Sequence, residues 1–197
     1  MPRIPAVDPA DAGPLVKFGY RMARKQLGEV PAPFAVLAHH RKLFVASARH
    51  ELAVQKATKV MPPQLIQLAV YRTAWTVGCS WCVDFGTMLM RLDELDVDRL
   101  KEIADFETSD KFTEADREVI RLSDAMTSTP MAVSDEQIAA LDQTYGHAGV
   151  VELAYQIGLE NQRARMNHAL GITDQGFSSG DSCRVPWAQD ELASQEA

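Results

Sequence analysis

The sequence contains no long hydrophobic run. Its longest apolar stretches, such as 34–38 and 43–46, are far shorter than the roughly 20 residues that cross a bilayer. The first residues, Met1 to Pro5, also lack the apolar core of a signal peptide. We therefore expect a cytoplasmic protein with no membrane partner.

Cysteine is scarce and present in an odd number, three in the whole chain. Cytoplasmic thiols are normally kept reduced, so we do not expect a structural framework of disulfides. Any close pair of cysteines must then be explained by redox chemistry, by metal binding or by packing.

An excess of positive charge is also missing, since the net charge is −7. This charge opposes binding to phosphate backbones, and we expect no nucleic-acid partner. Residues 1–60 nevertheless carry ten Lys or Arg against four Asp or Glu, hence +6, which leaves −13 for the remainder. We interpret this asymmetry as a basic first third that packs on an acidic rest, with a ligand-attracting patch as the alternative.

What the sequence has in abundance is helical periodicity. The length of 197 residues and the 46% hydrophobic content fit one globular domain, and no alternating run predicts a strand. We expect an all-α, single-domain bundle of about seven to eight helices. The predicted helices cover 14–27, 34–56 with a break near the middle, 64–77, 79–90, 97–104, one after Thr113, one after Ser134, and 148–170.

Several local signals place the ends of these helices. Pro62 and Pro63 suit a helix start, and Ser134 with Gln137 has the spacing of a capping box. Gly78 and Gly171 suit helix ends. The expected domain is 1–173, with helices in 12–60 as an extension of it. The remainder, 174–197, is predicted to be a tail without its own core, pinned by Phe177 or Trp187.

The most distinctive motif is Cys79-Ser80-Trp81-Cys82, near the start of a predicted helix. A separation of three places both sulfurs on one helix face, where the unpaired N–H groups of the first turn favour thiolate over thiol. A structural zinc needs four ligands, and the only further thiolate is Cys183. Redox use of the pair is therefore our main interpretation, with core packing and a metal site as alternatives.

Two segments carry a resemblance to a known family. The stretch 67–90, especially GCSWCVDF at 78–85, and the later stretch 154–172, with ENQRARMNH at 160–168, resemble the carboxymuconolactone decarboxylase and alkylhydroperoxidase D (AhpD-like) superfamily. The resemblance implies a helical bundle of the AhpD-like type that assembles into a homo-oligomer and needs no bound cofactor or metal. In the peroxidase branch it implies that Cys82 attacks a small hydroperoxide, Cys79 resolves it as a disulfide, and a dithiol reductant or reductase partner regenerates the pair.

The proton relay that the resemblance implies does not carry over intact. The family's glutamate falls on Gln67, and its histidine falls on Gly86. Glutamine cannot exchange a proton near neutral pH, and glycine has no side chain. Our hypothesis is that His168 or Glu160, on the last helix, supplies the proton transfer instead. A structural histidine with satisfied hydrogen bonds is the alternative for His168, which we expect on the same helix face as Asn161.

Four other residues have weaker signals. Tyr71 can extend a hydrogen-bond chain toward the thiols or only pack, and Trp81 can shield the pair or shape access to it. We expect Asp84 to be a solvated or capping carboxylate off the cysteine face. Cys183 is either an exposed redox partner or without a role.

The sequence thus favours a thiol-dependent peroxidase or disulfide oxidoreductase. One alternative is the decarboxylase side of the same family, which acts on a lactone acid without needing the cysteine pair. A second alternative is a non-catalytic oligomeric redox sensor, which the loss of the relay residues favours.

Overall fold

The computed structural model describes residues 2–178, and all of its regular structure is helical. The helices are α1 (Pro14–Leu27), α2 (Ala32–Leu37), α3 (Arg41–Ala57), α4 (Pro63–Val77), α5 (Ser80–Leu92), the 3₁₀ helix η1 (Asp98–Asp105), α6 (Glu114–Thr127) and α7 (Asp135–Ala169). The predicted all-α fold class is confirmed.

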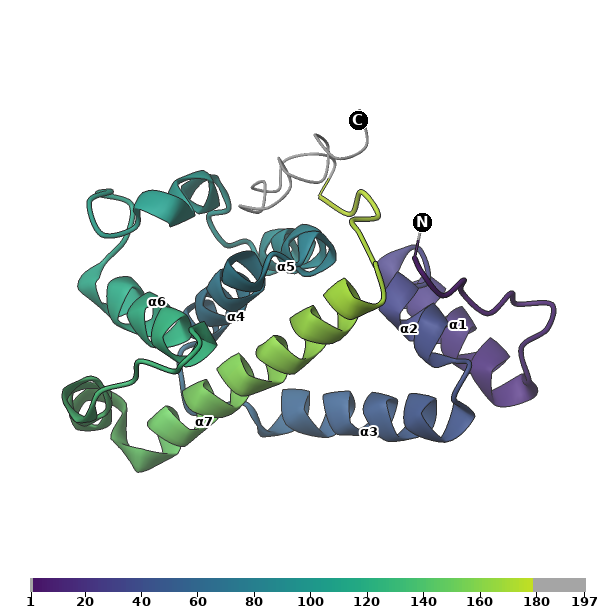
Figure 1. The fold of residues 1–197 in the computed structure, drawn as a ribbon, viewed down its shortest axis with the longest axis horizontal. Helices are drawn as coiled ribbons and strands as arrows, with labels where there is room; N and C mark the ends of the chain where they lie inside the picture. The colour runs from purple at the N-terminus through teal and green to yellow at the C-terminus, as the bar shows by residue number, and fades with distance from the viewer. Residues whose placement is uncertain (1, 179–197) are drawn as a thin grey trace.

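Helix α4 is the centre of the bundle. It packs against α5, α6 and α7, and Leu68 and Ala69 on it are fully buried (Figure 1). A helix that is apolar on nearly all sides has to be covered on all sides, which is the arrangement that its composition predicts. The start of α5 is thereby held between the end of α4 and the last turns of α7.

The N-terminal helices form a second, smaller cluster at one end of the molecule (Figure 1). Val16 and Tyr20 of α1 pack there with Ala35 of α2 and Phe44 of α3. Polar contacts join α3 to α7, among them a hydrogen bond between His50 Nε2 and the Tyr155 hydroxyl at 2.7 Å. These contacts connect the N-terminal end to the surface of α7, and Val36 of α2 packs into the main core.

The predicted helix ends agree closely with the structure. Gly78 ends α4 with a left-handed φ of 83°, a conformation that favours glycine, and the Ser134–Gln137 capping box is present. Gly146, with φ 69° and ψ 169°, kinks α7, so two predicted helices run into one another there. The break expected near the middle of 34–56 lies nearer its start, because the chain leaves the helix after Leu37 and the His40 ring accepts the Leu43 N–H at the start of α3.

A side chain of the N-terminal segment caps the C-terminal end of α7. The guanidinium of Arg3 donates to the backbone oxygens of His168 and Ala169, at 2.8 and 2.7 Å. A cation at this end also complements the helix dipole. Within residues 2–178, no helix combines the length and the low polarity needed to span a membrane.

Candidate active site

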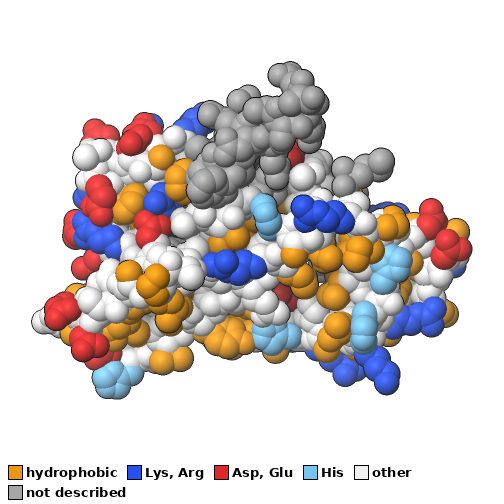
Figure 2. All heavy atoms as spheres, in the orientation of Figure 1, with side chains coloured by type: hydrophobic (Ala, Val, Ile, Leu, Met, Phe, Trp, Pro, Cys, Tyr) orange, Lys and Arg blue, Asp and Glu red, His pale blue; other side chains and the backbone are white. Residues whose placement is uncertain are grey.

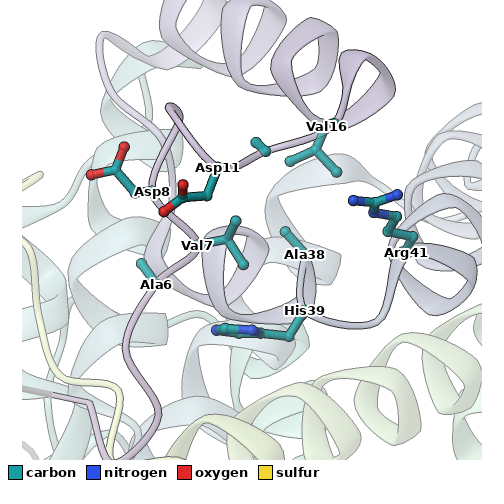
Figure 3. Close-up of a pocket in the computed structure, with 10 residues that line it drawn as sticks. Ala6, Val7, Asp8, Asp11, Val16, Ala38, His39 and Arg41 are labelled. Carbon is teal, nitrogen blue, oxygen red and sulfur yellow. The ribbon is translucent and has the colours of Figure 1, made fainter.

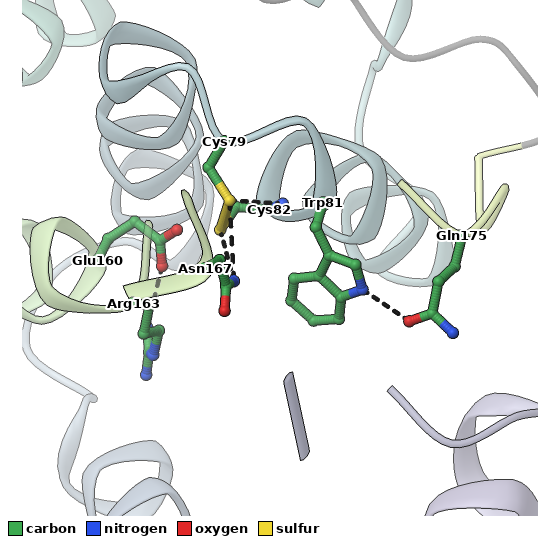
Figure 4. Close-up of a disulfide and its surroundings, with 7 residues drawn as sticks. All are labelled: Cys79, Trp81, Cys82, Glu160, Arg163, Asn167 and Gln175. Atoms are coloured by element: carbon green, nitrogen blue, oxygen red, sulfur yellow. Dashed lines mark hydrogen bonds and ion pairs between the residues drawn. A yellow bond between two sulfur atoms is a disulfide. The ribbon is translucent and has the colours of Figure 1, made fainter. Parts of the chain in front are cut away.

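The two cysteines form a disulfide at the point where the chain turns from α4 into α5 (Figure 4). After Gly78, the Cys79 N–H still donates to the Ala74 oxygen at 3.0 Å, which fixes the turn. Cys79 is the N-cap of α5, and its sulfur accepts the N–H of Cys82 at 3.2 Å. The Cα atoms of the pair are 5.3 Å apart, an ordinary separation for a disulfide. The predicted location of the pair at a helix start is confirmed.

The two sulfurs differ in their surroundings. Cys79 is 2% exposed and Cys82 is 8% exposed, so Cys82 is the more accessible of the two. The side-chain nitrogen of Asn167, on α7, lies 3.4 Å from the Cys82 sulfur and 3.8 Å from the Cys79 sulfur (Figure 4). The pair is thus a nearly buried group in contact with an amide of the last helix.

A buried carboxyl group lies on the same helix. Glu160 comes seven residues, or about two turns, before Asn167 and is 4% exposed, and Figure 4 shows it on the side of α7 that faces the disulfide. Burial raises the pKa of Glu160 to about 7, although Arg163, 3.3 Å away, opposes this shift. Arg163 also binds Glu51 of α3. A carboxyl group with this pKa can exchange a proton near neutral pH.

Aromatic rings cover the neighbouring face of α5. Trp81 stacks on Phe85 with 4.7 Å between ring centroids, and Phe177 from the segment after α7 meets both rings edge-on. The Trp81 indole N–H donates to the Gln175 side-chain oxygen at 2.7 Å (Figure 4). The prediction that Phe177 pins the segment after the last helix is confirmed, whereas Trp187 and Cys183 lie outside the described residues.

Asp84 holds this segment in place, and the expectation that it is solvated is wrong. It is 1% exposed, and its carboxylate accepts the N–H groups of Gln175, Gly176, Phe177 and Ser178 together with the Ser178 hydroxyl. Burial alone would raise its pKa, but the hydrogen bonds from Ser178, Phe177 and Gln175 outweigh burial and hold the pKa of Asp84 below its ordinary value. Five donors thus converge on one buried carboxylate, two residues after Cys82.

Solved structures of known proteins share this arrangement of helices. The debrominase Bmp8, solved as a cysteine-to-alanine variant with 2,3,4-tribromopyrrole, superposes with a TM-score of 0.74 at 21% identity over 96% of each chain. An alkylhydroperoxidase AhpD core protein from Ralstonia eutropha JMP134 superposes with a TM-score of 0.67 at 18% identity, over 91% of this chain and 96% of the other. The chain has the AhpD-like fold.

A comparison of sequences finds a curated relative of low identity. The uncharacterized protein YnjA of Escherichia coli K12 is 27% identical over 163 residues, which are 83% of this chain and 87% of YnjA. No protein-family model matches the chain. The likeness of the two solved structures thus confirms the AhpD-like fold that the resemblance of segments 78–85 and 160–168 implied.

Within this AhpD-like fold, the positions of the missing relay residues have other occupants. The Gln67 side chain donates to the carboxylate of Asp93, which is the C-cap of α5, at the end of that helix opposite the cysteines. A Cβ atom at Gly86 would lie 3.6 Å from the ring of Tyr71. The space beside Gly86 is therefore lined by a ring from α4.

The two candidates for proton transfer are placed differently. His168 is exposed, and the residue that its helix turns toward the sulfurs is its neighbour Asn167. Glu160 is buried on that same face. Asn161 is part-buried and donates to the Thr127 hydroxyl at 3.0 Å, away from the pair. The sequence pattern predicts His168 on the inward face at this end of α7, whereas the structure places Asn167, one residue earlier, on that face.

The structure has a hollow of about 380 Å³ elsewhere, among the N-terminal segments (Figure 3). Apolar residues including Val7 and Val16 line it together with Asp8, Asp11 and Arg41. Neither cysteine lines it. Among residues 2–178, no three His, Cys, Asp or Glu side chains gather in a way that could hold a metal ion.

Proposed function

We propose that this protein is a thiol-dependent oxidoreductase that reduces hydroperoxides, with Cys82 as the attacking thiol and Cys79 as the resolving thiol. The observation that carries the proposal is a CxxC pair that forms a disulfide at the start of α5. The face of α7 toward this disulfide carries a buried carboxyl group, Glu160, with a pKa of about 7. The greater exposure of Cys82, 8% against 2%, supports giving it the attacking role.

The reaction would run in two steps on the reduced pair. The Cys82 thiolate attacks the terminal oxygen of a hydroperoxide, the O–O bond breaks, and a proton converts the leaving alkoxide to an alcohol, with Cys82 left as a sulfenic acid. The Cys79 thiol then displaces water from that sulfur to form the disulfide. An external dithiol reduces the disulfide by exchange and becomes oxidised itself. The N–H groups at the start of α5 favour the thiolate form.

Glu160 is the group we propose as the donor of that proton. A neutral carboxylic acid is available below its pKa of about 7, and its buried position on the face of α7 that carries Asn167 supports this role over the exposed His168. Removing such a general acid typically lowers a rate by about 10²-fold or more. We expect Glu160→Gln to slow peroxide reduction by this factor and to abolish the decline in rate as pH rises through about 7.

The same variant should change the pH dependence of stability. The pKa of Glu160 is raised in the folded state, so its contribution to stability is present below the ordinary value of 4.5 and is lost as pH rises through about 7. This loss is roughly 3 kcal/mol. Denaturant unfolding between pH 5 and 8.5 should therefore show a flatter profile for Glu160→Gln than for the wild type. Glu51→Gln, at the other carboxylate bound to Arg163, is the control, and an equal flattening there would count against the assignment.

Reductive dehalogenation is a second candidate, because a debrominase superposes on 96% of the chain. Two thiols and a bromoarene would give a disulfide, the arene, bromide and a proton. The Trp81, Phe85 and Phe177 rings beside the pair suit a flat aromatic substrate.

One comparison separates the two candidates. The reduced protein is offered tert-butyl hydroperoxide, tribromopyrrole or a lactone acid, and peroxide loss, bromide release and lactone loss are measured against thiol loss. We expect rapid peroxide loss and little bromide. Bromide release at the faster rate would assign the dehalogenase, turnover of a lactone acid would assign the decarboxylase, and reversible disulfide formation without turnover would assign the redox sensor.

We further propose that copies of the chain associate. Several large apolar side chains are more than half exposed on α1, α3 and α7, and Figure 2 shows hydrophobic side chains on the face that carries α3 and α7. The side chains that are more than half exposed on these helices are Leu15, Phe18, Leu43, Leu52 and Val151. A monomer mass in sedimentation equilibrium would refute this association.

A further inference from the structure

Asn167 is a buried polar residue in direct contact with both sulfurs. It is 2% exposed, and its Nδ2 atom lies 3.4 Å from the Cys82 sulfur and 3.8 Å from the Cys79 sulfur (Figure 4). Neither the CxxC motif nor the relay residues implied by the family resemblance include it. Its N–H group is nearer to the sulfur that we assign as attacking.

The other end of the same amide supports a role beyond packing. The Oδ1 atom of Asn167 is buried and has no hydrogen-bond partner in the part of the chain that the structure describes. A buried amide oxygen without a partner is destabilising, and a leucine of similar size would fill this position without that penalty. The amide is therefore better explained by what its nitrogen does for the sulfurs than by its contribution to the core.

We propose that Asn167 is a further catalytic residue, whose side-chain N–H group stabilises the thiolate of Cys82. A thiolate is a much stronger acceptor than a thiol or a disulfide, so the hydrogen bond gains strength only when Cys82 becomes reactive. The donor is also neutral. Glu160 is the titratable group that shares this face of α7, and Arg163 is already bound by Glu160 and Glu51, so the amide supports the thiolate without a new charge beside them.

The test measures Cys82 alone, in a Cys79→Ser, Cys183→Ser background. The ultraviolet absorbance of the thiolate and the rate of iodoacetamide alkylation are followed against pH, with and without Asn167→Leu. Loss of a hydrogen bond to a charged group should raise the thiol pKa by about one to two units. Alkylation below the pKa should then slow by about 10- to 100-fold and should recover at high pH, a recovery that a merely structural defect would not give.

Asn161→Leu is the matched control, because it removes an amide from the same helix that bonds Thr127 and not the sulfurs. It should leave the Cys82 pKa unchanged. If circular dichroism shows that Asn167→Leu is unfolded, Asn167→Ala gives the same measurement. A Cys82 pKa that is unchanged in the folded variant overturns the inference.

The inference rests on the proposed function only in taking Cys82 as the attacking thiol. Neither readout uses a peroxide, so the two can fail separately. A shifted pKa in a protein that consumes no hydroperoxide would refute the proposed substrate and keep the role of Asn167. An unshifted pKa in an active peroxidase would refute the role of Asn167 and keep the proposed substrate.

Discussion

Cys82→Ser is expected to abolish peroxide reduction, with a loss of more than about 1,000-fold in rate, because a serine hydroxyl does not ionise near neutral pH and is a far weaker nucleophile than a thiolate. Cys79→Ser should behave differently. Its Cys82 can still attack, so one equivalent of peroxide should be consumed in a first turnover that then stops at the sulfenic acid. Single-turnover peroxide assays with trapping of the sulfenic acid by dimedone measure both results.

The third cysteine provides the control for this pair of variants. Cys183→Ser should retain multiple turnovers with a dithiol, since the proposed cycle uses Cys79 and Cys82 alone. Dimedone labelling of Cys79 in the Cys82→Ser variant would exchange the proposed roles. Full activity of Cys82→Ser would remove the pair from the reaction altogether.

Asp84→Ala is expected to lower the free energy of unfolding by about 3 kcal/mol, because it removes the buried acceptor of four backbone N–H groups and the Ser178 hydroxyl. The segment 175–178 should then detach from α5. Because Gln175 and Phe177 of that segment contact Trp81, the tryptophan should become more accessible to acrylamide. Denaturant unfolding, fluorescence quenching and hydrogen exchange of residues 175–178 measure the three effects.

The pH dependence of this contribution has the opposite sign to that of Glu160. The pKa of Asp84 is lowered in the folded state, so its stabilisation is present above the ordinary value of 3.8 and is lost only as pH falls below it. Asp98→Ala serves as the control, since Asp98 is exposed and pairs only on the surface with Lys101. Equal losses of stability in the two alanine variants would contradict the role given to Asp84.

The sequence predicted the fold well because local signals and burial agree along most of the chain. Helix α4 is apolar on all sides and lies at the centre, and Gly78, Gly146 and Ser134 act where their conformational preferences place them. The break between α2 and α3 was misplaced because it depends on a ring, that of His40, capping the next helix. No periodic pattern announces that contact.

The candidate site was predicted only in part. A spacing of three fixed the geometry of Cys79 and Cys82. Glu160 was named from the sequence as a substitute for the missing relay, and the structure shows that it is buried. Asn167 was missed because a phase error of one residue on a long helix exchanges it with His168. The roles of Asp84 and Gln175 were missed because each pairs with a residue about ninety positions away in the chain, a pairing that only the tertiary structure brings about.

The most direct test of the central claim is to titrate the reduced protein with one equivalent of hydroperoxide and to map the resulting bond by mass spectrometry. The proposed chemistry predicts that one peroxide is consumed for every two thiols lost, and that Cys79 and Cys82 of the same chain become joined. Peroxide consumption with both thiols still free, or a disulfide that involves Cys183 in place of either, would contradict it.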